Sequence, residues 1–510
     1  MLFNSYAFIF VFLPVTVIGF YYLGRERQTL AGFWLLLCSL FFYGWWNPPY
    51  VILLLASMIF NFMCAKAMTR KQLKLNKPLL IFGVGANLVL LGYYKYAHFL
   101  MQTMQAWVEF DDQFSSIILP LGISFFTFTQ IAFLVDTYRG EVKKFNFIHY
   151  GLFVTYFPHL IAGPILHHQE MMPQFAKPQS FRLKWQNLSV GLTLFALGLF
   201  KKVVLADGVA TFANPLFSAA LHGEALTFLG AWGGALAYSL QLYFDFSGYS
   251  DMAIGLSCLF GIKLPCNFNS PYQAVNIIEF WRRWHITLSR FLRDYLYIPL
   301  GGSRNGTIRR YLNLLITMLL GGLWHGAGWT FIVWGGLHGI FLLINHAWQK
   351  FRCLLGQDLT RSSLMGRWAA RSLTFLVVVV AWVFFRAENL DVAFSILDAM
   401  SGFQGIVLPN NWQNGLPLNY INILQKMGIT FIGVPDYSQA GLIIGLWGVV
   451  WFTPNTQQIL RNYSPTLDRP ALISRLNWQP SISNMVVVAV ILLYALTEIG
   501  TVSDFLYFQF

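Results

Sequence analysis

Long apolar runs separated by short polar loops are the dominant pattern of this chain. Each run has about 20 residues, the length that an α-helix needs to cross the hydrocarbon core of a bilayer. Strands of a membrane β-barrel are shorter and alternate between apolar and polar positions. The runs therefore predict an all-α, polytopic integral membrane helical bundle. The predicted spans are residues 8–23, 29–46, 50–68, 79–105, 117–135, 188–206, 225–246, 369–385, 440–453 and 484–501.

The composition agrees with a membrane protein. Of the 510 residues, 56% are hydrophobic and only 11% are charged, whereas soluble domains carry about 25% charged residues. No internal repeat is evident, so we expect a single membrane domain over residues 1–510. The first run has no basic residue before it and no small-residue cleavage site after it, so we expect a retained span rather than a cleaved signal peptide.

Lysine and arginine are concentrated in some loops and scarce in others, which predicts the topology because basic loops stay in the cytoplasm. The expected cytoplasmic segments are 70–77, 139–147, 282–310 and 350–371, and the expected outer segments are the N-terminus, 109–112 and 387–439. These basic loops account for the net charge of +13. They would face anionic lipid headgroups, so we expect a lipid bilayer and no nucleic acid as partner.

Two segments break the simple alternation of spans. Residues 149–164 contain Pro158, Gly163 and Pro164 and have basic loops on both sides, so we expect a re-entrant element buried in protein, with an ordinary kinked span as the alternative. The apolar runs 311–322 and 327–346 also have basic flanks. They predict an in-and-out hairpin whose turn lies deep in the protein.

The turn of this hairpin is the string Gly321-Gly322-Leu323-Trp324-His325-Gly326. An ionisable side chain at membrane depth is costly, so a functional site is the default hypothesis for His325. The alternative is a histidine that is only hydrogen-bonded inside the bundle. The flanking glycines allow close backbone packing around the imidazole and favour the functional interpretation.

A basic, aromatic segment lies between Asn276 and Pro299. On a helical wheel of about 100° per residue the arginines share one arc and the large apolar residues the opposite one. This predicts one interfacial amphipathic helix with His285 at the border of the two arcs. The arginines would contact lipid headgroups or form an entrance for a phosphorylated donor. The residues expected to bind the donor or line the site are Trp281, Arg282, Arg283, Trp284, Arg290, Arg293 and Trp324.

Other polar residues inside apolar stretches give weaker signals. Asp245 and Tyr249 are counted among the residues lining the site, although hydrogen bonding within the fold is the simpler role for Asp245. His338 is expected to pack between helices. The pair His167-His168 lacks a third ligand at suitable spacing, and the five cysteines form no CxxC pair, so we expect no metal site and no disulfide framework.

Several long motifs in fixed order resemble the membrane-bound O-acyltransferase family. They are residues 157–164, 241–255, 280–289, 321–326, 384–387 and 505–510. The resemblance runs from end to end of the chain. It implies a bacterial inner (cytoplasmic) membrane protein, multi-pass, with re-entrant segments around a central funnel, with His325 as the catalytic residue and His285 as a second polar residue near it.

The resemblance also implies the reaction. The family moves acyl groups from a cytoplasmic thioester donor, here expected to be acetyl-CoA, to a hydroxyl acceptor on or near the other side of the membrane. It implies a periplasmic acetyltransferase partner of the SGNH-hydrolase type and a polysaccharide acceptor, and no bound cofactor is expected. Alginate, acetylated cellulose and other exopolysaccharides are all compatible with the sequence.

Histidine suits the role of general base because its pKa lies near neutrality. We therefore assign His325 as the base and His285 as the group that orients the acceptor or donates to the oxyanion. No GxSxG motif is present, which favours direct transfer over an acyl-enzyme. The alternatives are a transporter or a scaffold subunit of an exopolysaccharide export complex, because re-entrant segments and buried histidines also suit transport.

Overall fold

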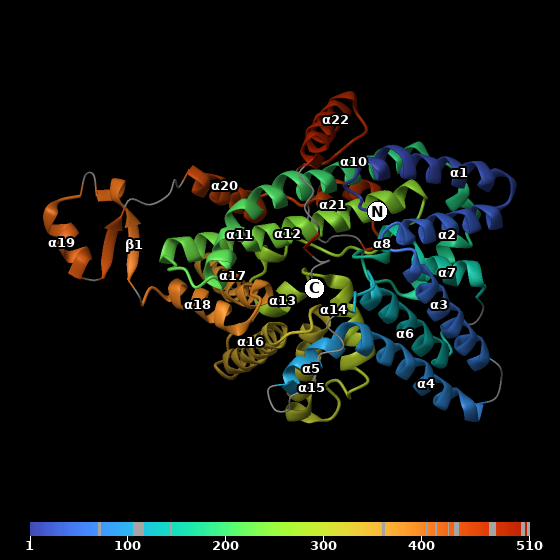
Figure 1. Ribbon diagram of the computed structural model, residues 1–510, viewed down its shortest axis with the longest axis horizontal. Coiled ribbons are helices and arrows are strands. Elements are labelled where there is room, and N and C mark those ends of the chain that lie inside the picture. The colour runs from blue at the N-terminus through green and yellow to red at the C-terminus, as the bar shows by residue number, and fades with distance from the viewer. Residues whose placement is uncertain are drawn as a thin grey trace.

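The structure is a computed structural model. It describes residues 1–69, 73–105, 117–142, 145–359, 363–403, 405–413, 416–426, 428–432, 438–468, 476–500 and 505–506. Within these residues the chain is helical almost throughout, which confirms the predicted all-α class (Figure 1). The exception is a short parallel pair formed by β1 (Ile406–Pro409) and β2 (Ile429–Ile432). The acidic segment 109–112 lies outside the described residues.

The predicted apolar runs form helices. The longer helices are α1 (Leu13–Glu26), α2 (Gln28–Gly44), α3 (Pro49–Met68), α4 (Leu73–Leu91), α6 (Ile123–Tyr138), α10 (Trp185–Phe200), α11 (Asp207–Leu221), α12 (Phe228–Leu259), α15 (Gly306–His325), α16 (Trp329–Leu354), α17 (Leu364–Arg386), α18 (Leu390–Ser401), α20 (Ser438–Phe452) and α22 (Ile482–Thr497). Seven helical stretches of the described residues are long and apolar enough to cross a membrane. The protein is therefore a multi-pass membrane protein.

The shorter elements connect these helices. They are α5 (Ala97–Gln105), α7 (Phe147–Thr155), α8 (Phe157–Leu160), α9 (His168–Phe175), α13 (Ile277–Trp281), α14 (Ile286–Leu292), α19 (Leu418–Lys426), α21 (Thr456–Ile459) and the π-helical turns η2 (Gly92–Tyr96), η4 (Lys201–Ala206) and η6 (Arg293–Tyr297). Figure 1 shows α19 and β1 projecting from one end of the bundle and α22 lying along another edge.

Helix α12 is the centre of the fold. Every residue from Ala237 to Leu259 is buried, and the helix packs along α10 and α11 (Figure 1). Glycines set its distance from α10, because a Cβ atom on Gly255 would lie 2.6 Å from the carbonyl oxygen of Gly191 and one on Gly198 would lie 2.6 Å from that of Gly248. Small residues at such positions let membrane helices approach closely without a hydrophobic driving force.

Buried ion pairs lock the same helices together. The Lys202 ammonium lies 2.8 Å from both Asp207 and Asp245, and Lys201 lies 2.7 Å from Asp251. Inside a low-dielectric core an unpaired charge would be strongly destabilising, so each partner is needed by the other. Asp245 therefore has a structural partner, as its position inside an apolar stretch suggested.

The expected re-entrant segment consists of α7 and α8, which are separated by a break at Tyr156. All four residues of α8 are buried, and so is the second half of α7 from Tyr150 to Thr155. The break frees backbone donors, and one of them, the amide of Phe157, is satisfied by the Ser39 hydroxyl at 3.2 Å. Irregular backbone at this depth is thus buried in protein, as the membrane environment requires.

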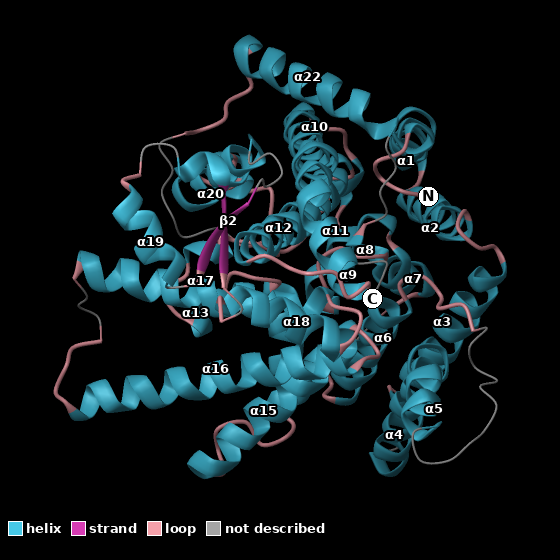
Figure 2. Ribbon diagram, turned by 60° about the vertical axis from the view of Figure 1, so that its left-hand side comes forward, coloured by secondary structure: helices cyan, strands magenta, loops and turns pink. Residues whose placement is uncertain are grey.

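Helices α15 and α16 form the predicted hairpin, with only residues 326–328 between them (Figure 2). Their backbones touch where two glycines face each other. A Cβ atom on Gly322 would collide with the carbonyl oxygen of Phe331, and one on Gly335 would collide with that of Met318. The turn that carries His325 therefore depends on side chains being absent at both positions.

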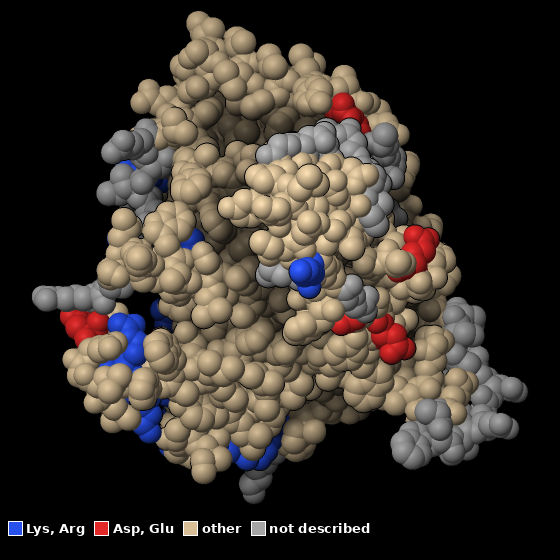
Figure 3. Space-filling view, turned by 90° about the vertical axis from the view of Figure 1, so that its left-hand side faces the viewer, with Lys and Arg blue, Asp and Glu red and all other residues tan. Residues whose placement is uncertain are grey.

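Most of the molecular face shown in Figure 3 carries no charged side chains, and the Lys, Arg, Asp and Glu residues stand in a few separate places on it. Many large apolar side chains elsewhere on the surface are exposed as well, as lipid contact requires. The basic segments also meet on one side, because the Arg139 guanidinium donates to the carbonyl oxygen of Asp294 at 3.3 Å. This contact agrees with the prediction that both segments face the cytoplasm.

The topology can be tested with one native cysteine. Cys353 is exposed in the last turn of α16, whereas Cys38, Cys64, Cys258 and Cys266 are buried. A membrane-impermeant maleimide applied to sealed right-side-out vesicles should leave Cys353 unlabelled because its segment is basic. In a Cys353→Ser background, Asp391→Cys in the acidic outer segment should be labelled. Labelling of Cys353 in sealed vesicles would contradict the topology, and detergent should expose both positions.

Glycine packing in the hairpin gives a matched pair of variants. Gly335→Ala should destabilise the protein by about 1–3 kcal/mol, because the new methyl group has no room. Gly336→Ala, one residue later, meets Leu319 at an ordinary 3.4 Å and should be neutral or slightly stabilising. Thermal unfolding in detergent, followed by size-exclusion chromatography, measures both. Equal melting temperatures for the two variants would show that α15 and α16 can move apart without loss of stability.

Candidate functional site

His325 is the last residue of α15 and lies at the hairpin turn, where only 5% of its surface is exposed. Aromatic rings surround its imidazole. The ring centroids of Trp324, Trp334 and Phe385 lie 4.9, 5.1 and 5.2 Å away. A histidine held among rings in this way keeps a fixed orientation and is shielded from bulk water.

His285 reaches the same place by a different route from the one predicted. The expected single amphipathic helix over 276–299 is wrong: α13 ends at Trp281, and His285 adopts the left-handed conformation with φ of 43° before α14 begins. The chain bends because its backbone pairs with a neighbouring segment. The amide of Ile286 donates to the Asn267 carbonyl at 3.0 Å, and that of Asn269 donates to the Arg283 carbonyl at 2.9 Å.

A left-handed backbone is costly for a residue with a side chain and is often found at functional sites. Here the cost is offset by full burial and by a hydrogen bond at 3.1 Å between His285 Nδ1 and Asn267 Oδ1. Asn267 also accepts from the Thr287 hydroxyl at 2.9 Å. This bond to Nδ1 fixes the orientation of the imidazole ring.

The two histidines lie side by side, with ring centroids 6.4 Å apart. They come from segments 40 positions apart in the chain, so the fold rather than local sequence brings them together. An atom bound midway between the rings would be in contact with both. The pair can therefore act on one reacting group, with one imidazole taking a proton and the other donating or accepting a hydrogen bond.

A cavity of about 620 Å³ leads to His325 and Trp324 from one side. Trp45 and Trp46 at the end of α2, Lys95 in η2 and the residues around the start of α6 form its walls. The charge pattern predicts that these helix ends lie on the outer side of the membrane. With that topology, the cavity would give a polar acceptor of moderate size a route to the buried histidine from outside.

Three of the four arginines predicted to bind a donor have carboxylate partners. Arg283 lies 2.6 Å from Glu279, and Arg293 lies 2.7 Å from its neighbour Asp294. Arg290 makes two bonds to Glu170, at 2.8 and 3.0 Å. Arg282 is exposed and has no ion pair within the described residues. Because the helix is broken, the four side chains do not form one continuous cationic face.

The predicted site-lining tryptophans fall into two groups. Trp324 borders the cavity and stacks on Phe128, with centroids 5.2 Å apart. Trp281 and Trp284 are buried behind the histidines, where Trp281 packs on Trp334 and Trp284 packs on Trp382 at 5.9 and 4.9 Å. They support the wall around His325 from the side away from the cavity.

Asp245 and Tyr249 lie in the packed core around α12 and the chain ends. Asp245 is engaged by Lys202 and accepts from the amide of Leu506 at 3.3 Å. Tyr249 packs between Phe3 and Phe505, with centroids 4.9 and 4.6 Å away. The structure shows neither residue in contact with His325 or His285. Both residues instead stabilise the packing of residues near the two ends of the chain against α12.

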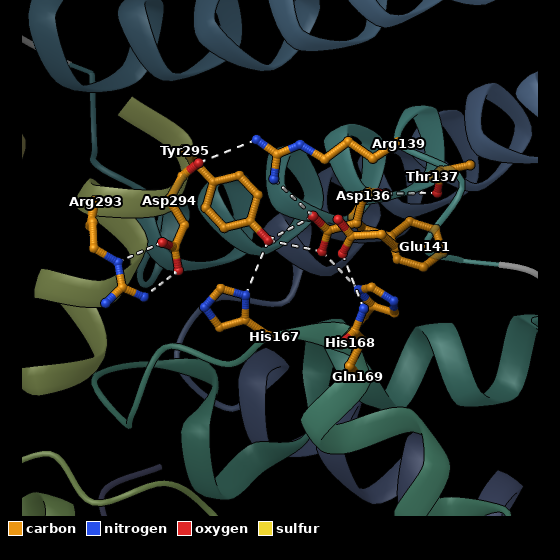
Figure 4. Close-up of polar contacts among 11 residues, drawn as sticks. Asp136, Thr137, Arg139, Glu141, His167, His168, Gln169, Arg293, Asp294 and Tyr295 are labelled. Atoms are coloured by element: carbon orange, nitrogen blue, oxygen red, sulfur yellow. Dashed lines mark hydrogen bonds and ion pairs between the residues drawn. The ribbon is translucent and has the colours of Figure 1, made fainter. Parts of the chain in front are cut away.

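The His167-His168 pair belongs to a polar cluster shown in Figure 4. His168 Nδ1 lies 2.8 Å from the Asp136 carboxylate, and His167 Nδ1 lies 3.1 Å from the Tyr295 hydroxyl. Tyr295 donates to Asp136 at 2.8 Å. Burial and the neighbouring carboxylate raise the pKa of Tyr295, so the phenol stays protonated and remains a donor. The described residues contain no group of three side chains suited to a metal ion.

Sequence reasoning missed two residues that contact the two histidines, Lys95 beside His325 and Asn267 beside His285. Lys95 lies inside a predicted apolar span, and an intramembrane lysine is itself a signal of function. Asn267 lies in a loop between α12 and α13 and carries no such signal. Its role becomes visible only when the fold brings it against His285.

Comparison with known proteins agrees with this arrangement. Residues 100–376 match the sequence profile described as MBOAT, membrane-bound O-acyltransferase family. A peptidoglycan O-acetyltransferase of Helicobacter pylori is 44% identical over 87% of this chain and 88% of its own length. A probable alginate O-acetylase AlgI of Pseudomonas aeruginosa is 41% identical over 89% and 82%.

A more distant relative is named for a different activity. A teichoic acid D-alanyltransferase of Streptococcus thermophilus is 28% identical over 55% of this chain and 71% of its own length. The profile match covers the segment that carries both histidines, and the two nearer relatives are similar over most of the chain. The chain therefore belongs to the membrane-bound O-acyltransferase family.

Proposed function

We propose that this O-acyltransferase passes an acetyl group from a cytoplasmic thioester donor to a hydroxyl acceptor and thereby O-acetylates an extracellular polysaccharide. The observation that carries the proposal is the position of His325, which is buried at the end of the outer cavity with the His285 ring 6.4 Å away. Histidine is the side chain best suited to take a proton from an attacking hydroxyl at neutral pH.

The names of the relatives support the acetyl group and the polysaccharide. Two relatives, at 44% and 41% identity, are named for O-acetylation, one of peptidoglycan and one of alginate. Their polymers differ, so the shared chemistry is ester formation on a polysaccharide hydroxyl. Alginate is one candidate polymer for this chain. The direct acceptor is either a sugar hydroxyl or a hydroxyl on a partner protein that passes the acetyl group on.

The proposed step is direct transfer. His325 removes the proton of the acceptor hydroxyl, whose oxygen attacks the thioester carbonyl. The carbon–oxygen bond forms, the carbon–sulfur bond breaks, and the leaving thiolate takes the proton from the imidazolium of His325, which regenerates the base. His285 orients the acceptor or donates a hydrogen bond to the oxyanion, a task in which fixed donors contribute most of their effect in water-excluded sites.

The proposed donor is acetyl-CoA, which arrives from the cytoplasm at the bacterial inner membrane. Arg282 is the residue of the basic segment that we assign to its phosphates, because it has no ion pair within the described residues. The proposed partner is a periplasmic acetyltransferase of the SGNH-hydrolase type, which would act on the outer side of the membrane. The predicted topology puts the opening of the cavity next to His325 on that side, which supports this partner.

Replacing the proposed base tests the function. His325→Ala should leave folding intact but lower acetyl transfer by about 10²–10⁴-fold, the usual contribution of a general base. His285→Ala should be impaired less, because water can replace part of an orienting bond. The measurement is ester-bound acetate on surface polysaccharide from cells that express each variant at equal levels.

His222→Ala is the matched control, because His222 is exposed at the end of α11 and its imidazole bonds to the Ser218 carbonyl, far along the chain from both site histidines. It should behave like the unchanged protein. Normal polymer acetylation by His325→Ala would remove this residue from the mechanism and favour a transporter. Complete loss of acetate together with loss of complex assembly would favour a scaffold.

The donor assignment has its own test. Arg282→Ala should raise the KM for acetyl-CoA by roughly 10- to 100-fold with little change in kcat, because losing one charged hydrogen bond costs about 1.5–3 kcal/mol. Arg309→Ala, on α15 and outside the 276–299 segment, should leave the donor KM unchanged. If Arg282→Ala lowers expression or membrane insertion with an unchanged KM, the arginine contacts lipid headgroups instead.

A further inference from the structure

A lysine is buried directly beside His325. Lys95 is 9% exposed, and its ammonium donates to the carbonyl oxygens of Trp324 at 2.6 Å and His325 at 3.1 Å. The Ser124 hydroxyl lies 3.5 Å from the same nitrogen. The three hydrogens of the ammonium are thus directed at groups that surround the catalytic turn, and the side chain also borders the outer cavity.

The neighbouring residue Tyr96 contacts the same end of α15. Its hydroxyl donates to the Leu323 carbonyl at 3.0 Å. The last four carbonyls of a helix have no partner within the helix, and here three consecutive ones are satisfied from outside. Both donors come from the π-helical turn η2, and such turns often occur at functional sites.

The charge of Lys95 is not matched by a carboxylate of the described residues within 4 Å. Lys202 is also buried, but its charge is balanced in the usual way, by carboxylates: Asp207 and Asp245 both lie 2.8 Å away. For Lys95 the negative end of the α15 dipole and the two carbonyls take that place. An apolar side chain would fill the same space without the cost of burying an ammonium. The charge is therefore explained by its bonds to the catalytic turn.

We propose that Lys95 is a positioning residue for His325: it holds the backbone of the last turn of α15, with Tyr96, so that the imidazole faces the outer cavity. This inference rests on the proposed role of His325 as the base. His325 is the last residue of α15, and only the short connection to α16 follows it. We call the bonds from Lys95 and Tyr96 to these carbonyls the clamp. Without the clamp the last turn of α15 would unwind, and the imidazole ring would move away from the acceptor.

The expected size of the effect follows from geometry. A displacement of about 1 Å in a reacting group can lower the rate by about 10²-fold. Lys95→Met keeps the length and apolar stem of the side chain and removes the ammonium. It should lower kcat by about 10- to 100-fold while the KM for the acyl donor changes by less than about 3-fold, because the donor does not bind through this side chain.

The decisive experiment is a double-mutant cycle. If Lys95 acts through His325, Lys95→Met should cause no further loss of the residual turnover of His325→Ala. Lys95→Arg should recover a part of the activity, because the cavity beside the side chain has room for a guanidinium. Lys66→Met is the matched control: Lys66 is an exposed lysine in the last turn of α3 and should be without effect.

Tyr96→Phe removes one hydroxyl from the same clamp. This variant serves as the test if the Lys95→Met protein does not accumulate in the membrane. It should lower kcat by about 3- to 10-fold, the loss of one neutral hydrogen bond. Unchanged kcat in Lys95→Met, or in Tyr96→Phe if the first variant fails to fold, would overturn the proposal. So would an additive loss in the His325→Ala background. Full activity of His325→Ala would instead overturn the proposed base.

Discussion

The site depends on one constraint: a helix can end deep inside a membrane protein only if other parts of the chain satisfy its terminal backbone groups. Helix α15 ends at His325, which is buried. The close contact between Gly322 and Gly335 brings α16 near enough to return at once, and Lys95 and Tyr96 donate to the exposed carbonyls. Together these contacts allow an imidazole to stand at the end of a buried helix.

The second histidine is held by the same principle applied to a different backbone. The chain around His285 is not helical, and its backbone pairs with residues 267 and 269 instead, so that these amides and carbonyls still have partners. This pairing forces the left-handed conformation at His285 and turns its ring toward His325. Both histidines therefore owe their positions to irregular backbone, and both irregular segments are stabilised by polar side chains that a simple bundle of straight spans would not contain.

These two cases explain how far the sequence could predict the molecule. Helices are local, and lipid forces long apolar runs, so the spans and the α15–α16 hairpin with His325 at its turn followed from the pattern alone. The helical wheel failed around His285 because it assumes an unbroken helix. Pairing with Asn267, 18 positions away, is a tertiary contact that periodicity cannot reveal. Lys95 could have been noticed as a charge in an apolar span, but its partners on α15 could not.

Charged side chains are arranged differently on the two sides of the histidine pair. On the basic side, Arg283, Arg290 and Arg293 are paired with carboxylates, and the Asp136 cluster ties α6 to η6 (Figure 4). On the side of the cavity, the described wall carries the Lys95 ammonium and aromatic rings. Arginines that are paired with carboxylates do not strongly attract a phosphate. In the proposed mechanism, selection of a charged donor therefore rests on the few cations without a carboxylate partner among the described residues, whereas the cavity would select its acceptor by shape and by the orientation of one imidazole.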